Sequence, residues 1–189
     1  MNAFDYLSVL FSIVLGLSIT QLLAGFAGMV RGRARIAFYW PLPLQMLALF
    51  LINVQSWWAM FGMRYMKSWT FFSFFVVLMQ ITFTYLMSAT ITPDPVGEEG
   101  RLDQREFFFR EKTWFFAVSL CAILSSLTKD LFVIPGPVGA PDMVAHGLFI
   151  ALILTGLFTT KDWVIKTVIP ATFILYCAYI ALLFVSLPG

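Results

Sequence analysis

Six hydrophobic segments determine what this chain can fold into. Their approximate ranges are 6–30, 41–64, 69–91, 112–133, 143–160 and 163–187. Each is close to the roughly 20 residues that an α-helix needs to cross about 30 Å of hydrocarbon. The 189 residues are 60% hydrophobic and only 12% charged, well below the roughly 25% charged residues of soluble domains. The sequence therefore predicts an all-α integral membrane protein, in which residues 1–189 form one domain and a six-transmembrane-helix bundle.

The connections between these segments carry a weak sign of internal symmetry. The second and third segments, and the fifth and sixth, are joined by short connections, whereas the connections after the first and the fourth are longer. Two halves of three helices each, inserted in opposite directions, would have this arrangement. The spacing thus weakly suggests a 3+3 inverted repeat, without supporting similarity between individual residues.

Positively charged residues orient the predicted bundle. One side carries nine Lys and Arg residues: Arg31, Arg33, Arg35, Arg101, Arg105, Arg110, Lys112, Lys161 and Lys166. The other side carries Arg64, Lys67 and Lys129. Because Lys and Arg are enriched in cytoplasmic loops, we expect a cytoplasmic loop at 92–111 and both termini outside. We see no cleavable signal sequence and no other targeting signal in this compact chain. We therefore expect the bacterial inner membrane, with periplasmic termini. An organellar membrane is the alternative.

Polar side chains inside the predicted spans allow two functional interpretations. The set is Gln21, Gln45, Asn53, Gln55, Gln80 and Thr84, and all of its members are uncharged. Such groups avoid lipid, so they either hydrogen-bond the helices to one another or form a neutral polar pathway or ligand site between the first three helices. We favour helix bonding, in a non-catalytic structural or accessory subunit. A small channel-like or transporter-like bundle, or one that binds a lipid or hydrophobic ligand, is the alternative.

Two other regions resemble association surfaces. On the first helix, Ser8, Ser12 and Gly16 form one stripe of small residues, and Ser18, Gly25 and Gly28 lie on roughly the opposite side together with Gln21. Small residues allow close packing of helices in lipid, so we expect this helix to be packed on both faces, in a homo-oligomer or against a membrane-protein partner. Residues 105–112 suit an early start of the fourth helix, with its first turns among lipid headgroups, or else a docked partner: Arg105, Phe107, Phe108, Phe109, Arg110 and Lys112.

The inventory of reactive residues argues against catalysis. The chain has one histidine and two separated cysteines, which do not form a recognisable zinc, haem or iron–sulfur pattern. Nucleotide-binding motifs and basic nucleic-acid-binding stripes are also absent from the sequence, so we expect no cofactor, no metal and no nucleic-acid partner. Asp142 and His146 lie one helical turn apart, and Lys129 and Asp130 could lie near them. They form either a pH-sensitive or metal-assisting site, or a helix cap beside an interfacial histidine.

Overall fold

The computed structural model describes residues 3–66, 68–94 and 100–183. Its main elements are α1 (Ala3–Arg31), α2 (Pro41–Met60), α3 (Phe71–Ile91), α4 (Gln104–Phe132), α5 (Ala140–Phe158) and α6 (Asp162–Leu183). The short helices η1 (Arg33–Arg35) and η2 (Phe61–Tyr65) follow α1 and α2. Strands β1 (Ile36–Ala37) and β2 (Leu102–Asp103) pair in parallel, with Ile36 opposite Leu102.

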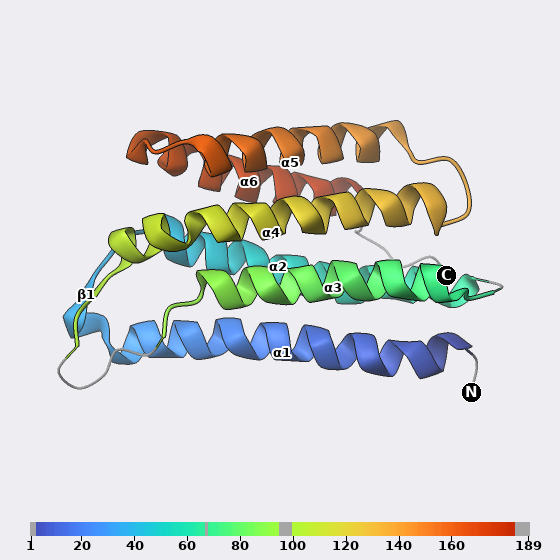
Figure 1. The fold of residues 1–189 in the computed structure, drawn as a ribbon, viewed down its shortest axis with the longest axis horizontal. Helices are drawn as coiled ribbons and strands as arrows, with labels where there is room; N and C mark the ends of the chain where they lie inside the picture. Colours follow the sequence, from blue (N-terminus) through green and yellow to red (C-terminus); the bar gives the residue numbers. More distant parts are fainter. Residues whose placement is uncertain (1–2, 67, 95–99, 184–189) are drawn as a thin grey trace.

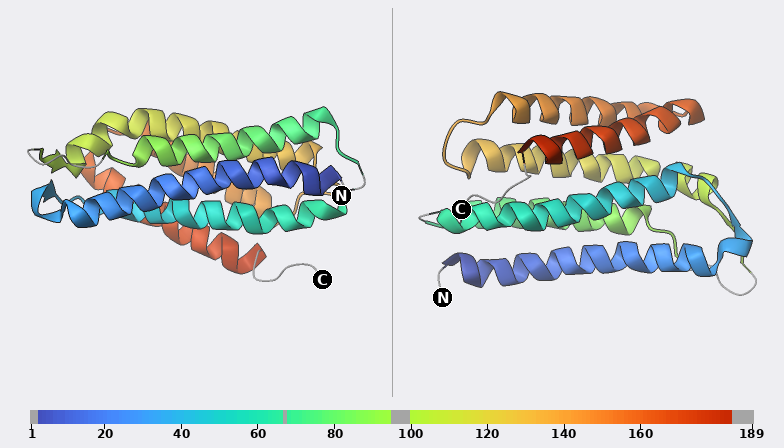
Figure 2. Two further views of the ribbon diagram at one scale, coloured as in Figure 1. Left: turned by 90° about the horizontal axis from the view of Figure 1, so that it is seen from below. Right: turned by 180° about the vertical axis from the view of Figure 1, so that it is seen from behind.

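The six long helices lie side by side in an elongated bundle (Figure 1). All six are long and apolar enough to cross a membrane, which supports the predicted helical bundle and a multi-pass membrane protein. Helix α1 lies at one edge, where it packs on α2 and α3, while α5 and α6 lie at the opposite edge (Figure 2). Successive helices reverse direction, so the start of α1 and the end of α6 lie at the same end of the bundle.

The start of α4 matches the interpretation of an early start and precedes the span at 112–133. The helix begins at Gln104 rather than near 112, so the predicted loop at 92–111 contains β2 and the first turns of α4; its residues 95–99 lie outside the described part of the chain. An Asp103 carboxylate oxygen accepts hydrogen bonds from the backbone N–H groups of Arg105 and Glu106, at 2.8 and 3.0 Å. This N-cap, held in place by the β1–β2 pair, explains the early start.

The largest hydrophobic core fills one half of the bundle. Its members come from the end of α1 and α3 and from the beginning of α2, α4 and α6, and they include Leu22, Leu42, Ile91, Phe108 and Ile165. A smaller core at the other end joins the start of α1 to η2 and α3 through Phe11, Leu15, Met60, Met63, Val77 and Ile81. Tight packing is therefore concentrated toward the two ends.

Within the part of the chain that the structure describes, α1 is packed on one face. Ser18 is fully buried and donates a hydrogen bond to the Ser88 hydroxyl at 2.8 Å. A Cβ atom added at Gly25 would lie 2.3 Å from Thr92 Cγ2, so this glycine permits the close approach of α1 to α3. Ser12 and Gly16 are exposed, and a Cβ atom added at Gly16 would meet nothing within 4 Å. Packing on the second face, predicted from the sequence, would therefore need another molecule.

Candidate intramembrane cavity

A cavity of about 280 Å³ lies among α2, α3, α4, α5 and α6. Much of its wall is apolar, with side chains such as Ile52, Met60, Val77 and Phe149. Polar side chains from four helices also line it: Gln45, Gln55, Ser56, Gln80, Thr84, Ser119, Ser126, Thr172, Tyr176 and Tyr179. Among the described residues, α1 contributes nothing to this lining, so the cavity differs in position from the pathway predicted between the first three helices.

The two ends of the cavity have different properties. One end is lined by Phe115, Phe116 and Gln45, which are 1%, 3% and 4% exposed, so the protein closes it. At the other end the lining continues through the charged residues of α4 and α5 to Ile134, which is 40% exposed. We call this second end the mouth, because there the cavity wall meets the surface of the bundle.

Four residues at the mouth form a polar cluster between the end of α4 and the start of α5. His146 is 4% exposed, and its Nδ1 lies 2.9 Å from the backbone oxygen of Asp142. Its Nε2 lies 3.3 Å from Ser126 Oγ and 3.5 Å from Asp130 Oδ2. Lys129 Nζ lies 3.4 Å from the other oxygen of Asp130. The structure thus brings together Asp142, His146, Lys129 and Asp130, which the sequence only suggested as neighbours.

Aromatic residues of α5 and α6 form the wall next to this cluster. The rings of Phe149, Tyr176 and Tyr179 have centroids 6.0–6.1 Å apart. The Tyr179 hydroxyl donates to Asp142 Oδ1 at 2.8 Å, and the Tyr176 hydroxyl donates to Gln55 Oε1 at 2.8 Å. These two bonds tie α6 to α5 and to α2 and leave the flat faces of the rings for apolar contact.

Four of the six predicted intramembrane polar residues line the cavity: Gln45, Gln55, Gln80 and Thr84. Gln55 bonds to another helix through Tyr176, whereas the Thr84 hydroxyl donates to the backbone oxygen of Gln80 on its own helix, at 3.0 Å. Within the described residues, the side chains of Gln45 and Gln80 have no hydrogen-bond partner. Helix bonding therefore accounts for Gln55 in this group, and it leaves two cavity-facing amides unexplained.

The other two predicted residues lie away from the cavity. Asn53 is fully buried, and its Nδ2 donates to the backbone oxygen of Leu49 one turn earlier, at 2.8 Å. Its Oδ1 is buried without a hydrogen-bond partner among the described residues. Gln21 is half-buried on α1 and does not line the cavity. Neither side chain forms a described hydrogen bond to a second helix.

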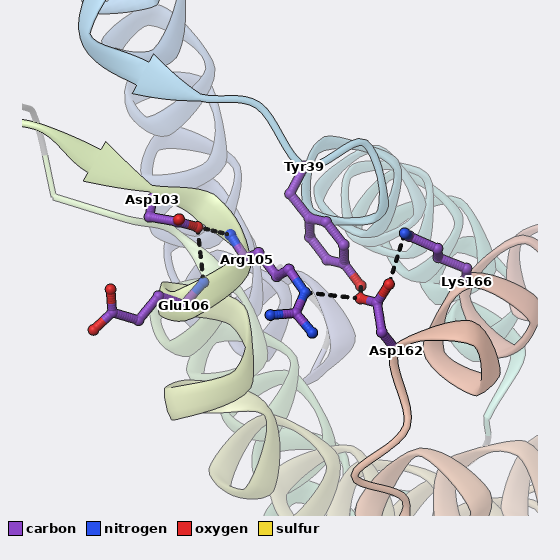
Figure 3. A network of polar contacts seen from close by, with 6 residues as sticks. All are labelled: Tyr39, Asp103, Arg105, Glu106, Asp162 and Lys166. Carbon is purple, nitrogen blue, oxygen red and sulfur yellow. Dashed lines mark hydrogen bonds and ion pairs between the residues drawn. The ribbon is translucent and has the colours of Figure 1, made fainter.

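A network of charged and polar groups ties together the end of the bundle opposite the mouth (Figure 3). Asp162, at the start of α6, accepts a hydrogen bond from the Tyr39 hydroxyl at 2.9 Å. The same carboxylate pairs with Arg105 Nε at 3.2 Å and with Lys166 Nζ at 2.6 Å. We call Tyr39, Arg105, Asp162 and Lys166 the clasp. Burial, followed by the Asp162 hydrogen bond, raises the pKa of Tyr39, so its hydroxyl remains a donor at neutral pH.

The clasp is continuous with the start of α4. The Gln104 side-chain oxygen accepts a hydrogen bond from the Tyr39 backbone N–H at 2.9 Å, and its Nε2 lies 2.9 Å from Met29 Sδ. This buried amide links the segment before α2 to α1 and α4. The Gln104 amide and the β1–β2 pair fix the connections that follow α1 and α3 against the start of α4. These contacts close this end of the bundle.

The basic and aromatic residues expected at lipid headgroups are mostly used inside the protein. Phe107 and Phe108 are 8% and 0% exposed and belong to the main core. Lys112 is also buried, and its Nζ donates to the backbone oxygens of Gly156 and Leu157, which end α5, at 3.3 and 3.1 Å. A cation at a helix C-terminus is favourable, so Lys112 has a structural partner.

The remaining members of that predicted surface are more accessible. Arg105 belongs to the clasp although more than half of its side chain is exposed. Arg110 is exposed and pairs with Glu111 at 2.8 Å, and Phe109 is half-buried. The predicted headgroup or partner surface is therefore reduced to these three residues.

Comparison of the chain with models of protein families, with curated proteins and with solved structures found no match. The functional argument therefore rests on the geometry of the cavity, its mouth and the clasp.

Proposed function

We propose that this protein binds a small amphipathic molecule inside the bilayer, in the cavity enclosed by α2 to α6. The observation that carries the proposal is the pair of amides at Gln45 and Gln80, which line the cavity without a hydrogen-bond partner among the described residues. Neither amide is among the fully enclosed unpaired atoms of the described residues, and an amide left unpaired in a dry interior would cost about 1–3 kcal/mol. Water or the polar group of a ligand inside the cavity would supply the partners that the protein lacks.

The size and lining of the cavity define the class of ligand. Its volume of about 280 Å³ is near the lower limit of ligand pockets, which occupy about 300–1,000 Å³. A compact, mainly apolar molecule with one uncharged hydrogen-bonding group would match the apolar wall and the glutamine side chains, because an amide offers both donors and acceptors. The role is one of binding or passage, without a catalytic step.

A structural role in an assembly remains a second candidate. It is favoured by the exposed face of α1, where Ser12 and Gly16 lie among large apolar side chains such as Ile13 and Leu17, both 56% exposed. This face could contact lipid or a second copy of the chain. Self-association through α1 would leave the cavity unchanged, because the cavity lies on the other side of α2 and α3.

We also propose that the protein lies in a bacterial inner membrane with the clasp end in the cytoplasm. The clasp end carries most of the positive charge, including Arg31, Arg101 and Arg110, which is typical of cytoplasmic loops. The mouth and both termini would then be periplasmic. Reporter fusions at each terminus test this orientation, and a cytoplasmic signal from either end would contradict it.

Photoaffinity labelling tests the binding proposal. The probe is a diazirine analogue of a short-chain alcohol, applied to the purified protein, with the labelled residues mapped by mass spectrometry. We expect labels on cavity residues such as Met63 and Tyr176, and their loss in Ser119→Trp, which fills the cavity from α4. Leu124→Trp is the matched control, because Leu124 is on the exposed face of the same helix. Labels confined to the outer surface, or unchanged by Ser119→Trp, would overturn the proposal.

A further inference from the structure

The hydrogen bonds of His146 determine which of its ring nitrogens is available. Nδ1 faces the backbone oxygen of Asp142, which can only accept, so Nδ1 carries a proton. In the neutral ring, Nε2 therefore presents a lone pair toward Ser126 and toward Asp130 Oδ2 at 3.5 Å. A lone pair facing a carboxylate oxygen is unfavourable unless a proton or a metal cation lies between them. Metal-binding histidines are oriented in this way, with the second nitrogen donating to a backbone carbonyl or a carboxylate.

The carboxylates of Asp130 and Asp142 complete a compact set of donor atoms with the His146 ring. One atom each from Asp130, Asp142 and His146 can be chosen so that all three lie within 4.8 Å of one another. Asp142 is itself oriented by the Tyr179 hydroxyl, which donates to Oδ1 at 2.8 Å. Ligands that are held by second partners in this way are typical of built metal sites.

We propose that Asp130, Asp142 and His146 bind a divalent transition-metal ion, best matched by Zn²⁺, at the mouth of the cavity. Zn²⁺ bonds to histidine nitrogen and carboxylate oxygen are about 2.0–2.2 Å long, so ligand atoms in a tetrahedral site lie roughly 3.4 Å apart. The 3.5 Å between Nε2 and Asp130 Oδ2 already matches this spacing. Three protein ligands leave a fourth position that can hold water or a ligand atom.

Lys129 competes with the metal ion for Asp130. Its Nζ lies 3.4 Å from Asp130 Oδ1, so an ion bound to this carboxylate is repelled by the ammonium group or displaces it. This competition distinguishes the proposed site from nonspecific binding elsewhere. Removal of the Lys129 charge strengthens binding at the proposed site and has little effect on a distant one.

The first experiment measures Zn²⁺ binding by equilibrium dialysis, with the full chain purified in mild detergent without a polyhistidine tag. We expect one Zn²⁺ per chain and, at about 100 times the dissociation constant, a rise in melting temperature of about 5 °C or more. His146→Gln should weaken binding at least about 100-fold, and Tyr179→Phe about 10-fold, because Tyr179 acts by positioning Asp142. Lys129→Gln should strengthen binding. Glu106→Gln, an exposed carboxylate at the clasp end, should leave it unchanged.

Co²⁺ supplies a second measurement. Four-coordinate Co²⁺ absorbs visible light strongly, and this band should appear in the wild-type chain and be lost in Asp130→Asn, which remains informative if His146→Gln does not fold. Binding that is absent, or that is equal in wild type, His146→Gln and Asp130→Asn, would overturn the proposal. Zn²⁺ and Co²⁺ binding are measured without a ligand in the cavity. A failure of the proposed metal site can therefore be distinguished from a failure of the proposed ligand binding.

Discussion

The substitution Asn53→Leu tests the helix-bonding interpretation at one intramembrane amide. Asn53 is fully buried, its Oδ1 has no partner among the described residues, and its Nδ2 donates to Leu49 on its own helix. Leucine has a similar branched shape. The substitution removes an unpaired acceptor, which costs about 1–3 kcal/mol, and it removes a local hydrogen bond worth about 0.5–1.5 kcal/mol. The expected net effect is stabilisation by about 1 kcal/mol.

Unfolding of the purified protein in mild detergent measures this effect. A gain of about 1 kcal/mol corresponds to a rise in melting temperature of about 2–4 °C for a chain of this size. If Asn53 instead bonded two helices, its loss would destabilise the fold. A fall in stability of Asn53→Leu by about 1 kcal/mol or more would refute the reasoning from its unpaired oxygen.

Three other substitutions test contacts that the structure places between helices, and a fourth, Gly16→Leu, is a control on the exposed face of α1. Tyr176→Phe should destabilise the fold by about 1 kcal/mol, because Gln55 Oε1 loses the hydrogen bond from the Tyr176 hydroxyl. A lower melting temperature in thermal unfolding would show this loss. Asp162→Ala should lower the free energy of unfolding by about 2 kcal/mol, mostly because the Tyr39 hydroxyl loses its acceptor, since the exposed ion pairs contribute little. Chemical denaturation that gives no loss would contradict the clasp. Gly25→Leu should prevent stable folding, because any Cβ atom there overlaps Thr92. Gly16→Leu should leave the melting temperature unchanged and should alter only the migration of an assembly on a native gel.

The membrane spans were predictable from the sequence because hydrophobicity over about 20 residues is a local property. The early start of α4 was also expected, but its N-cap at Asp103 was not, because it is held by a strand pair between β1 and β2, which are far apart in the chain. The clasp was missed for the same reason. The i, i+4 spacing of Asp162 and Lys166 is visible in the sequence, but the Tyr39 partner lies 123 residues away.

The candidate site was predictable only in part. Gln45, Gln55, Gln80 and Thr84 were identified as inward-facing, because lipid excludes such groups. That these residues line one cavity depends on how α3 packs on α4 and how α2 packs on α6, and the pattern of a single helix does not reveal this packing. At the mouth, the Asp142–His146 spacing was visible, whereas the role of Tyr179 required α6 to lie beside α5.

Thiol labelling at one position inside the cavity tests the central claim most directly. In a chain with Ser at positions 121 and 177, whose native cysteines are exposed, Ser119→Cys is compared with Ser18→Cys. Both serines are buried, at 4% and 0% exposure, but only Ser119 lines the cavity. A small charged methanethiosulfonate reagent should modify Ser119→Cys at least about tenfold faster, since Ser18→Cys requires local opening of the bundle. Equal, slow modification at both positions would mean that the cavity is closed to water, and it would contradict the account.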